Sequence, residues 1–139
     1  MTTQGFLFAR QKSPLRWPLA LAAALAAVAH IPVIGSHLHE APYMGVLFIV
    51  LTAACLALAT GALTYDSPAI YAASAVTCSL AVVGYAVTRL IALPMLADDV
   101  GNWLEPLGIV SVAAELVVVA LAVAALGHRS PHSSIAARS

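Results

Sequence analysis

The sequence predicts an all-α, polytopic membrane protein, a four-transmembrane-helix bundle with both chain ends in the cytoplasm. Three observations predict it. Of the 139 residues, 62% are hydrophobic and 9% are charged, whereas soluble domains carry about a quarter charged residues. The apolar residues come in four blocks, each close to the roughly 20 residues that a transmembrane helix needs. The basic residues gather mainly at the two ends of the chain.

Each block is expected to form one helix, because lipid offers no hydrogen-bond partner to an open backbone. At a rise of about 1.5 Å per residue, such a helix crosses a hydrocarbon layer of about 30 Å. The expected spans are residues 17–36, 42–65, 67–88 and 106–127. The tails at residues 1–16 and 128–139 are expected to be mobile and dispensable for the bundle.

The first span has a rival interpretation as a signal peptide. Basic residues precede an alanine-rich core and an Ala27-Val28-Ala29 cleavage pattern. The apolar run nevertheless continues to Ile34, which is long enough to span a bilayer. A retained span is therefore preferred, and cleavage would leave three spans with the same outer loops.

The second and third spans each contain one cysteine, Cys55 and Cys78. Both are expected near the bilayer midplane, where the two thiols can approach one another. Neither belongs to a CxxC motif, and neither has the exposed, electropositive setting of a reactive cysteine. Two packed thiols are expected, with a buried disulfide as the alternative.

The fourth span contains a single carboxylate, Glu115. The span is expected to begin at Pro106, because the first helical position does not need an N–H group. An isolated charge at membrane depth costs on the order of 2.5 to 3.5 kcal/mol or more, so Glu115 must face the bundle interior. Gly108 and Ser111 precede it at helical spacing and form a small, polar stripe with it.

The distribution of charge predicts the topology. Basic residues flank the first and last spans at Arg10, Lys12, Arg16, Arg129 and Arg138. The positive-inside rule therefore places both termini in the cytoplasm, with residues 35–41 forming an outer turn and residues 93–105 an outer loop. The formal net charge is zero, which excludes the basic surface that nucleic acid requires and leaves the lipid bilayer as the expected partner.

Histidines gather on the outer side of the first two spans. The candidate metal ligands are His30, His37, His39, Glu40 and Met44. Imidazole and carboxylate ligands suit zinc, copper or iron, and a thioether shifts the preference toward Cu⁺. The spacing matches no standard zinc motif, and loop histidines are often merely solvated, so metal binding is the minority interpretation.

A second set of candidates suits a cation or small ligand: Arg89, Asp98, Asp99, Glu105 and Glu115. For Glu115, a proton, ion or ligand site competes on equal terms with a structural pairing to Arg89 or His30. Arg89 is more often explained by snorkelling or by an ion pair with an outer carboxylate. Asp98 and Asp99 either attract cations or simply keep the loop soluble.

Three segments resemble those of small actinobacterial membrane proteins: His30-Ile31-Pro32, residues 37–45 and residues 101–108. The resemblance covers most of the spanning region. It implies the same fold and a multi-pass location in the bacterial inner (plasma) membrane, and it implies no particular activity.

The preferred functional prediction is an outer vestibule that binds a cation or small ligand, with transition-metal handling as its sharpest version. The alternative is a non-catalytic accessory or assembly subunit that packs against a larger membrane complex or forms a homo-oligomer. An enzyme ranks third, because no nucleophile and base stand at a usable spacing.

Overall fold

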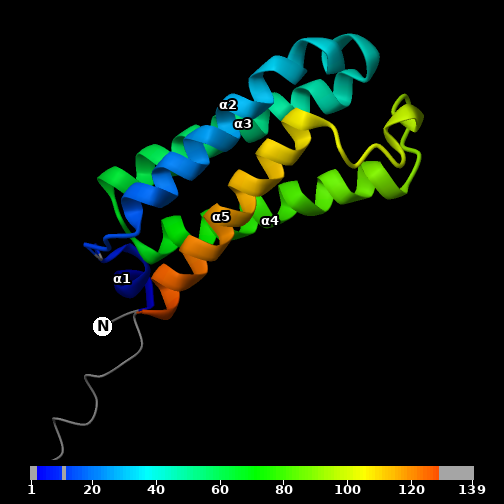
Figure 1. Cartoon of the computed structure of the whole chain (residues 1–139). Helices are drawn as coiled ribbons and strands as arrows, with labels where there is room; N and C mark the ends of the chain where they lie inside the picture. The colour runs from blue at the N-terminus through cyan, green and yellow to red at the C-terminus, as the bar shows by residue number, and fades with distance from the viewer. Residues whose placement is uncertain (1–2, 11, 129–139) are drawn as a thin grey trace, which may run out of the picture.

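The computed structural model describes residues 3–10 and 12–128, and this part of the chain is helical without any strand. The elements follow one another as α1 (Thr3–Phe8), α2 (Arg16–Glu40), α3 (Pro42–Thr64), α4 (Pro68–Leu90), the 3-10 turn η1 (Ala97–Asp99) and α5 (Pro106–Gly127). Four of these helices, α2 to α5, are long and apolar enough to cross a membrane. The predicted all-α bundle of four spans is therefore confirmed (Figure 1).

Proline marks the start of three of the four long helices. Pro42, Pro68 and Pro106 each occupy the first turn of their helix, where the fixed φ of proline suits the helix and its missing N–H is not needed. Glu105 completes the start of α5 by accepting hydrogen bonds from the backbone N–H groups of Leu107 and Gly108. The predicted bounds of α3 and α5 therefore agree with the structure to within one residue.

The predicted outer turn at residues 35–41 is wrong. Helix α2 continues to Glu40, and the chain reverses at Ala41 alone, which has φ −142° and ψ 82°. The reversal is this tight because Pro42 starts the next helix immediately and the Ala41 N–H still donates to the His37 carbonyl over 2.8 Å. His37 and His39 therefore lie in the last helical turn and not in a loop.

The prediction of a wholly mobile N-terminal tail is also wrong for the described residues. Residues 3–8 form α1, which contacts α4. The Ser13 N–H donates to Asp66 Oδ2 over 2.9 Å, and the Arg16 guanidinium lies 3.5 Å from the same oxygen. Asp66, a buried carboxylate that follows the second span, thus holds the segment that precedes the first span in place. The predicted C-terminal tail lies, apart from His128, outside the described residues.

The four long helices pack unevenly. Contacts are most extensive between α2 and α3, and those between α3 and α4 are the fewest of the neighbouring pairs. Figure 1 shows α3 and α4 spreading apart toward the end of the bundle that holds residues 91–105. We call this the loop end. The opposite end, where α1, residues 65–67 and the end of α5 meet, is the terminal end.

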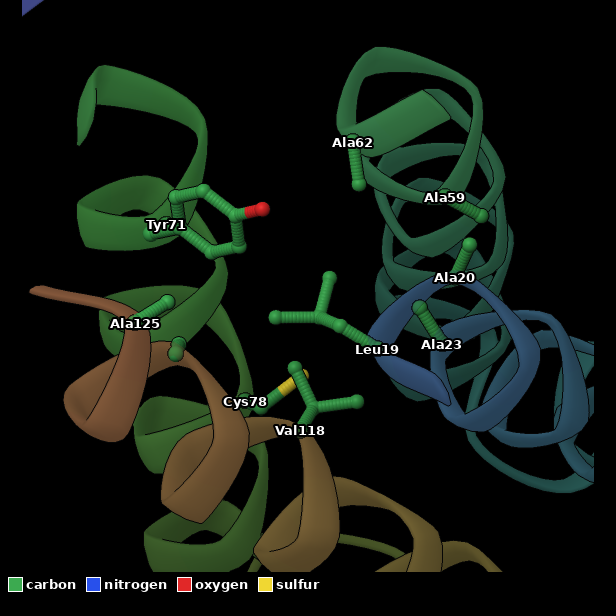
Figure 2. Close-up of a cluster of buried hydrophobic side chains, with 10 residues drawn as sticks. Leu19, Ala20, Ala23, Ala59, Ala62, Tyr71, Cys78, Val118 and Ala125 are labelled. Atoms are coloured by element: carbon green, nitrogen blue, oxygen red, sulfur yellow. The ribbon is translucent and has the colours of Figure 1, made fainter. Parts of the chain in front are cut away.

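The apolar core lies toward the terminal end. Leu19 of α2 projects between Tyr71 and Cys78 of α4 and Val118 of α5, and all four side chains are almost completely buried (Figure 2). Between α2 and α3 the core is made of alanines such as Ala20 and Ala62. Such small residues allow helix backbones to approach closely, which is how helices associate in lipid.

Large apolar side chains cover the outside of the bundle. Leu21, Val50, Leu80 and Val123 are each more than half exposed, and they come from four different helices. A soluble monomer does not leave so much apolar surface in contact with water. Together with the lengths of the helices, this surface identifies a multi-pass membrane protein.

Candidate functional site

A cavity of about 830 Å³ lies in the loop-end half of the bundle. It is lined by α2, α3, α4, the connection at residues 91–105 and the first turns of α5. Its walls are mostly aliphatic and aromatic, and a few polar side chains reach it. This volume lies within the range of about 300 to 1,000 Å³ that is typical of small-molecule sites.

Arg89 is the central charged group at the loop end of this cavity. Its side chain is only 7% exposed, and its Nη1 lies 3.1 Å from Asp99 Oδ2. The guanidinium carbon lies 4.5 Å from the centre of the Tyr85 ring. Among the described residues, the Nε and Nη1 groups nevertheless have no acceptor in hydrogen-bond geometry. Arg89 is thus neutralised by Asp99, while two of its buried donors remain unsatisfied.

The long connection between α4 and α5 folds back over Arg89. The Gly101 N–H donates to the Arg89 carbonyl over 2.9 Å, and the Tyr85 hydroxyl donates to the Trp103 carbonyl over 3.0 Å. Gly101 has φ +80°, a left-handed conformation that glycine adopts without strain. These bonds hold Asp99 beside Arg89 at the cavity.

Glu105 has a structural role in addition to lining the cavity. Its Oε1 accepts from the Leu107 N–H over 3.2 Å, and its Oε2 accepts from the Gly108 N–H over 2.5 Å. The carboxylate therefore caps the positive end of α5. The neighbouring Asp98 is exposed and does not line the cavity.

His30 and Glu115 meet at the deep end of the cavity. His30 Nε2 lies 3.4 Å from Glu115 Oε1, and the two side chains are 6% and 2% exposed. His30 lines the cavity, whereas Glu115 lies behind it. The expectation that Glu115 faces the bundle interior is confirmed, and its partner is His30.

The side chains of Cys55 and Cys78 lie next to each other between α3 and α4. Both are free and buried, and their side chains lie close enough to interact with each other. The predicted approach of the two thiols is therefore confirmed. Glu115 lies close enough to both to interact with them electrostatically, so each of the four spans contributes one polar group to this level of the bundle.

The predicted metal ligands are not gathered at one point. His37 Nδ1 lies 2.8 Å from the Val33 carbonyl, and its ring packs edge-on against Phe48. His39 and Glu40 are exposed at the end of α2. Within residues 3–10 and 12–128, no three His, Cys, Asp or Glu side chains form a group that could hold a metal ion. The cavity brings together His30, His37 and Met44 with Arg89, Asp99 and Glu105.

Asp66 is a buried polar site that the sequence analysis missed. It is 0% exposed and binds the Ser13 N–H, the Arg16 guanidinium and the Tyr71 hydroxyl. Its surroundings in the sequence, a Ser-Pro pair after the second span, suggested only a turn. The sequence did offer one indication of this site, because Asp66 is the one acidic residue expected on the cytoplasmic side of the membrane, where Arg16 is also expected.

Comparison of the chain with protein-family models, with curated proteins and with solved structures gave no match. The resemblance to small actinobacterial membrane proteins stays a prediction. Function is accordingly argued from the geometry of the cavity.

Proposed function

We propose that this membrane protein binds a small, largely apolar organic molecule in the cavity of its loop-end half. The observation that carries the proposal is the cavity itself, about 830 Å³ and lined by all four spans and the connection between α4 and α5. Its lining combines apolar walls with a few polar groups, which is the usual composition of a ligand pocket. A subunit whose only role is packing has no need for such a space.

An organic ligand fits the lining better than a metal ion does. The groups that suit a metal are dispersed, and no group of three forms in the described residues. Aromatic rings, in contrast, lie along the cavity at Tyr43, Phe48 and Tyr85. We place the protein in a bacterial inner membrane, with the loop end on the extracytoplasmic side, on the distribution of basic residues and on the resemblance described above.

Trp103 provides a spectroscopic test of binding. Its ring centre lies 6.3 Å from that of Tyr85, which lines the cavity. The chain has two tryptophans, so Trp17→Phe leaves Trp103 as the only indole. We expect its emission to change saturably, in lipid nanodiscs, with at least one of three probes of similar shape: tetraphenylphosphonium, neutral triphenylphosphine oxide and tetraphenylborate.

Filling the cavity is expected to abolish this signal. Gly84 lines the cavity, and a Cβ atom there would meet nothing within 4 Å, so Gly84→Leu extends into open space. The matched control is Gly35→Leu, because Gly35 is also helical with open space around its Cβ position but does not line the cavity. Saturable binding that survives Gly84→Leu, or no binding of any probe to the folded parent protein, would refute the proposed site.

A further inference from the structure

The contact between His30 and Glu115 requires one proton more than a neutral imidazole and an ionised carboxylate carry between them. His30 Nδ1 lies 2.6 Å from the Ala26 carbonyl oxygen, which can only accept, so Nδ1 carries a hydrogen. In a neutral imidazole Nε2 is then an acceptor, and it faces Glu115 Oε1 at 3.4 Å. A bare lone pair and a carboxylate oxygen repel each other. One further proton, on either Nε2 or the carboxyl group, therefore makes the contact favourable and the pair neutral.

Among residues 3–10 and 12–128, the surroundings offer Glu115 no other counter-ion. From α3 and α4 the titratable groups beside it are the thiols of Cys55 and Cys78, and from α2 it is His30 itself. Within the described residues, the buried Arg89 pairs with Asp99 and Arg16 pairs with Asp66. Loss of the shared proton therefore leaves one uncompensated negative charge at membrane depth, a state that is costly unless another cation replaces the proton.

The cavity is the route by which such a cation arrives. His30 forms part of its wall, and the Phe48 ring lies 5.4 Å from the His30 ring. An aromatic face beside a site of negative charge attracts organic cations. The charged side chains that line the cavity are one guanidinium, Arg89, and two carboxylates, Asp99 and Glu105. Among the described residues their formal sum is −1, so the formal charge of the lining does not oppose a cation even before the pair loses its proton.

We propose that the cavity takes lipophilic organic cations, and that an entering cation exchanges with the proton held by the His30–Glu115 pair. This inference rests on the proposed function, since it names the class of ligand for the same cavity. In the exchange, one monovalent cation enters the cavity and one proton leaves to the water. No covalent bond other than that to the proton is broken, and the net charge of the occupied protein equals that of the empty one.

The test uses tetraphenylphosphonium with the full chain in nanodiscs. We expect it to bind more tightly than triphenylphosphine oxide or tetraphenylborate, and to release one proton per bound cation into a weakly buffered medium that contains a pH indicator. At pH values at which the empty pair still holds its proton, the Kd for tetraphenylphosphonium should fall by about tenfold per unit rise in pH, because one proton is exchanged, and it should level off once the empty pair has lost that proton.

Two variants separate the pair from the rest of the cavity. Glu115→Gln keeps the shape of the side chain, and its amide donates to His30 Nε2 without an extra proton. We expect it to lose proton release and the pH dependence of Kd, with tetraphenylphosphonium bound roughly tenfold more weakly. His30→Asn leaves the proton on Glu115 alone, so proton release should persist while its pH dependence shifts. The control is His128→Asn, since His128 Nδ1 likewise lies 2.6 Å from the carbonyl of Ala124 but pairs with no carboxylate in the part of the chain that the structure describes.

The outcomes distinguish the two proposals. Two results would overturn the exchange but not the proposed binding cavity. In one, Glu115→Gln binds tetraphenylphosphonium and still releases the same number of protons. In the other, the parent protein binds tetraphenylphosphonium without releasing any proton. Preferential binding of tetraphenylborate or of the neutral probe would overturn the proposal that the ligand is a lipophilic cation, but not the proposed binding cavity. Failure of all three probes to bind the folded protein would overturn both the cavity's function and this inference.

Discussion

Replacing Asp66 with alanine is expected to destabilise the protein by about 3 to 5 kcal/mol. Hydrogen bonds to a charged group each contribute roughly 1.5 to 3 kcal/mol, and a left-handed backbone costs alanine about 1 to 2 kcal/mol. Asp66 is fully buried, has φ +47° and binds Ser13, Arg16 and Tyr71. It is the point at which the segment before α2 is attached to the start of α4. We therefore expect detachment of residues 3–16, measured as faster amide exchange there and a lower unfolding temperature in detergent.

Two milder substitutions show which part of this effect comes from which contact. Asp66→Asn tolerates the left-handed conformation but removes the charge that faces Arg16, so the loss should be smaller. Tyr71→Phe removes only the 2.5 Å hydrogen bond from the Tyr71 hydroxyl to the Asp66 carboxylate and should cost about 1.5 to 3 kcal/mol. If Asp66→Ala were as stable as the parent protein, the terminal end would not depend on this carboxylate.

Gly45→Ala is expected to destabilise the loop end by about 1 to 3 kcal/mol, the usual cost of overpacking. A Cβ atom at Gly45 would lie 2.7 Å from the backbone nitrogen of Leu38. Backbone atoms cannot rotate away as a side chain does, so α2 and α3 must separate at the Ala41 reversal. The change is measured as the free energy of unfolding in a detergent titration.

Gly35→Ala is the matched control for this prediction. Gly35 lies in α2 close to the same reversal, but a Cβ atom there meets nothing within 4 Å. Alanine should therefore be neutral, or stabilising by about 0.5 to 1 kcal/mol through its higher helix propensity. Equal effects at the two positions would show that the close approach at Gly45 does not limit the packing of α2 against α3.

The proposed exchange gives a role to the buried groups that packing alone leaves unexplained. Glu115 Oε1 is buried without a hydrogen-bond donor in good geometry, although His30 lies beside it. Such a group is costly to retain in a bundle whose buried apolar side chains are mostly alanine. A site that holds and releases one proton accounts for both residues and for the cavity next to them.

The sequence by itself determined the class of the fold, the four spans and the inward position of Glu115. These follow from physics that acts along one chain: lipid demands helices of a certain length, proline marks where they start, and a charge cannot face hydrocarbon. The N-terminal helix and the length of α2 were not predictable in this way. The N-terminal helix depends on contacts with distant segments, such as that of Ser13 with Asp66, and the length of α2 depends on the tight reversal at Ala41.

The tertiary structure alone decided which polar residues act together. In the sequence, His30 stood as one of several histidines, and the outer acids formed one undivided group. The packing of α2 against α5 pairs His30 with Glu115, the return of residues 91–105 pairs Arg89 with Asp99, and Glu105 is used to cap α5. Helix α3 spreads from α4 toward the loop end (Figure 1), and both helices line the cavity. Helix rotation and separation are set by contacts between spans, and no periodicity within a single span encodes them.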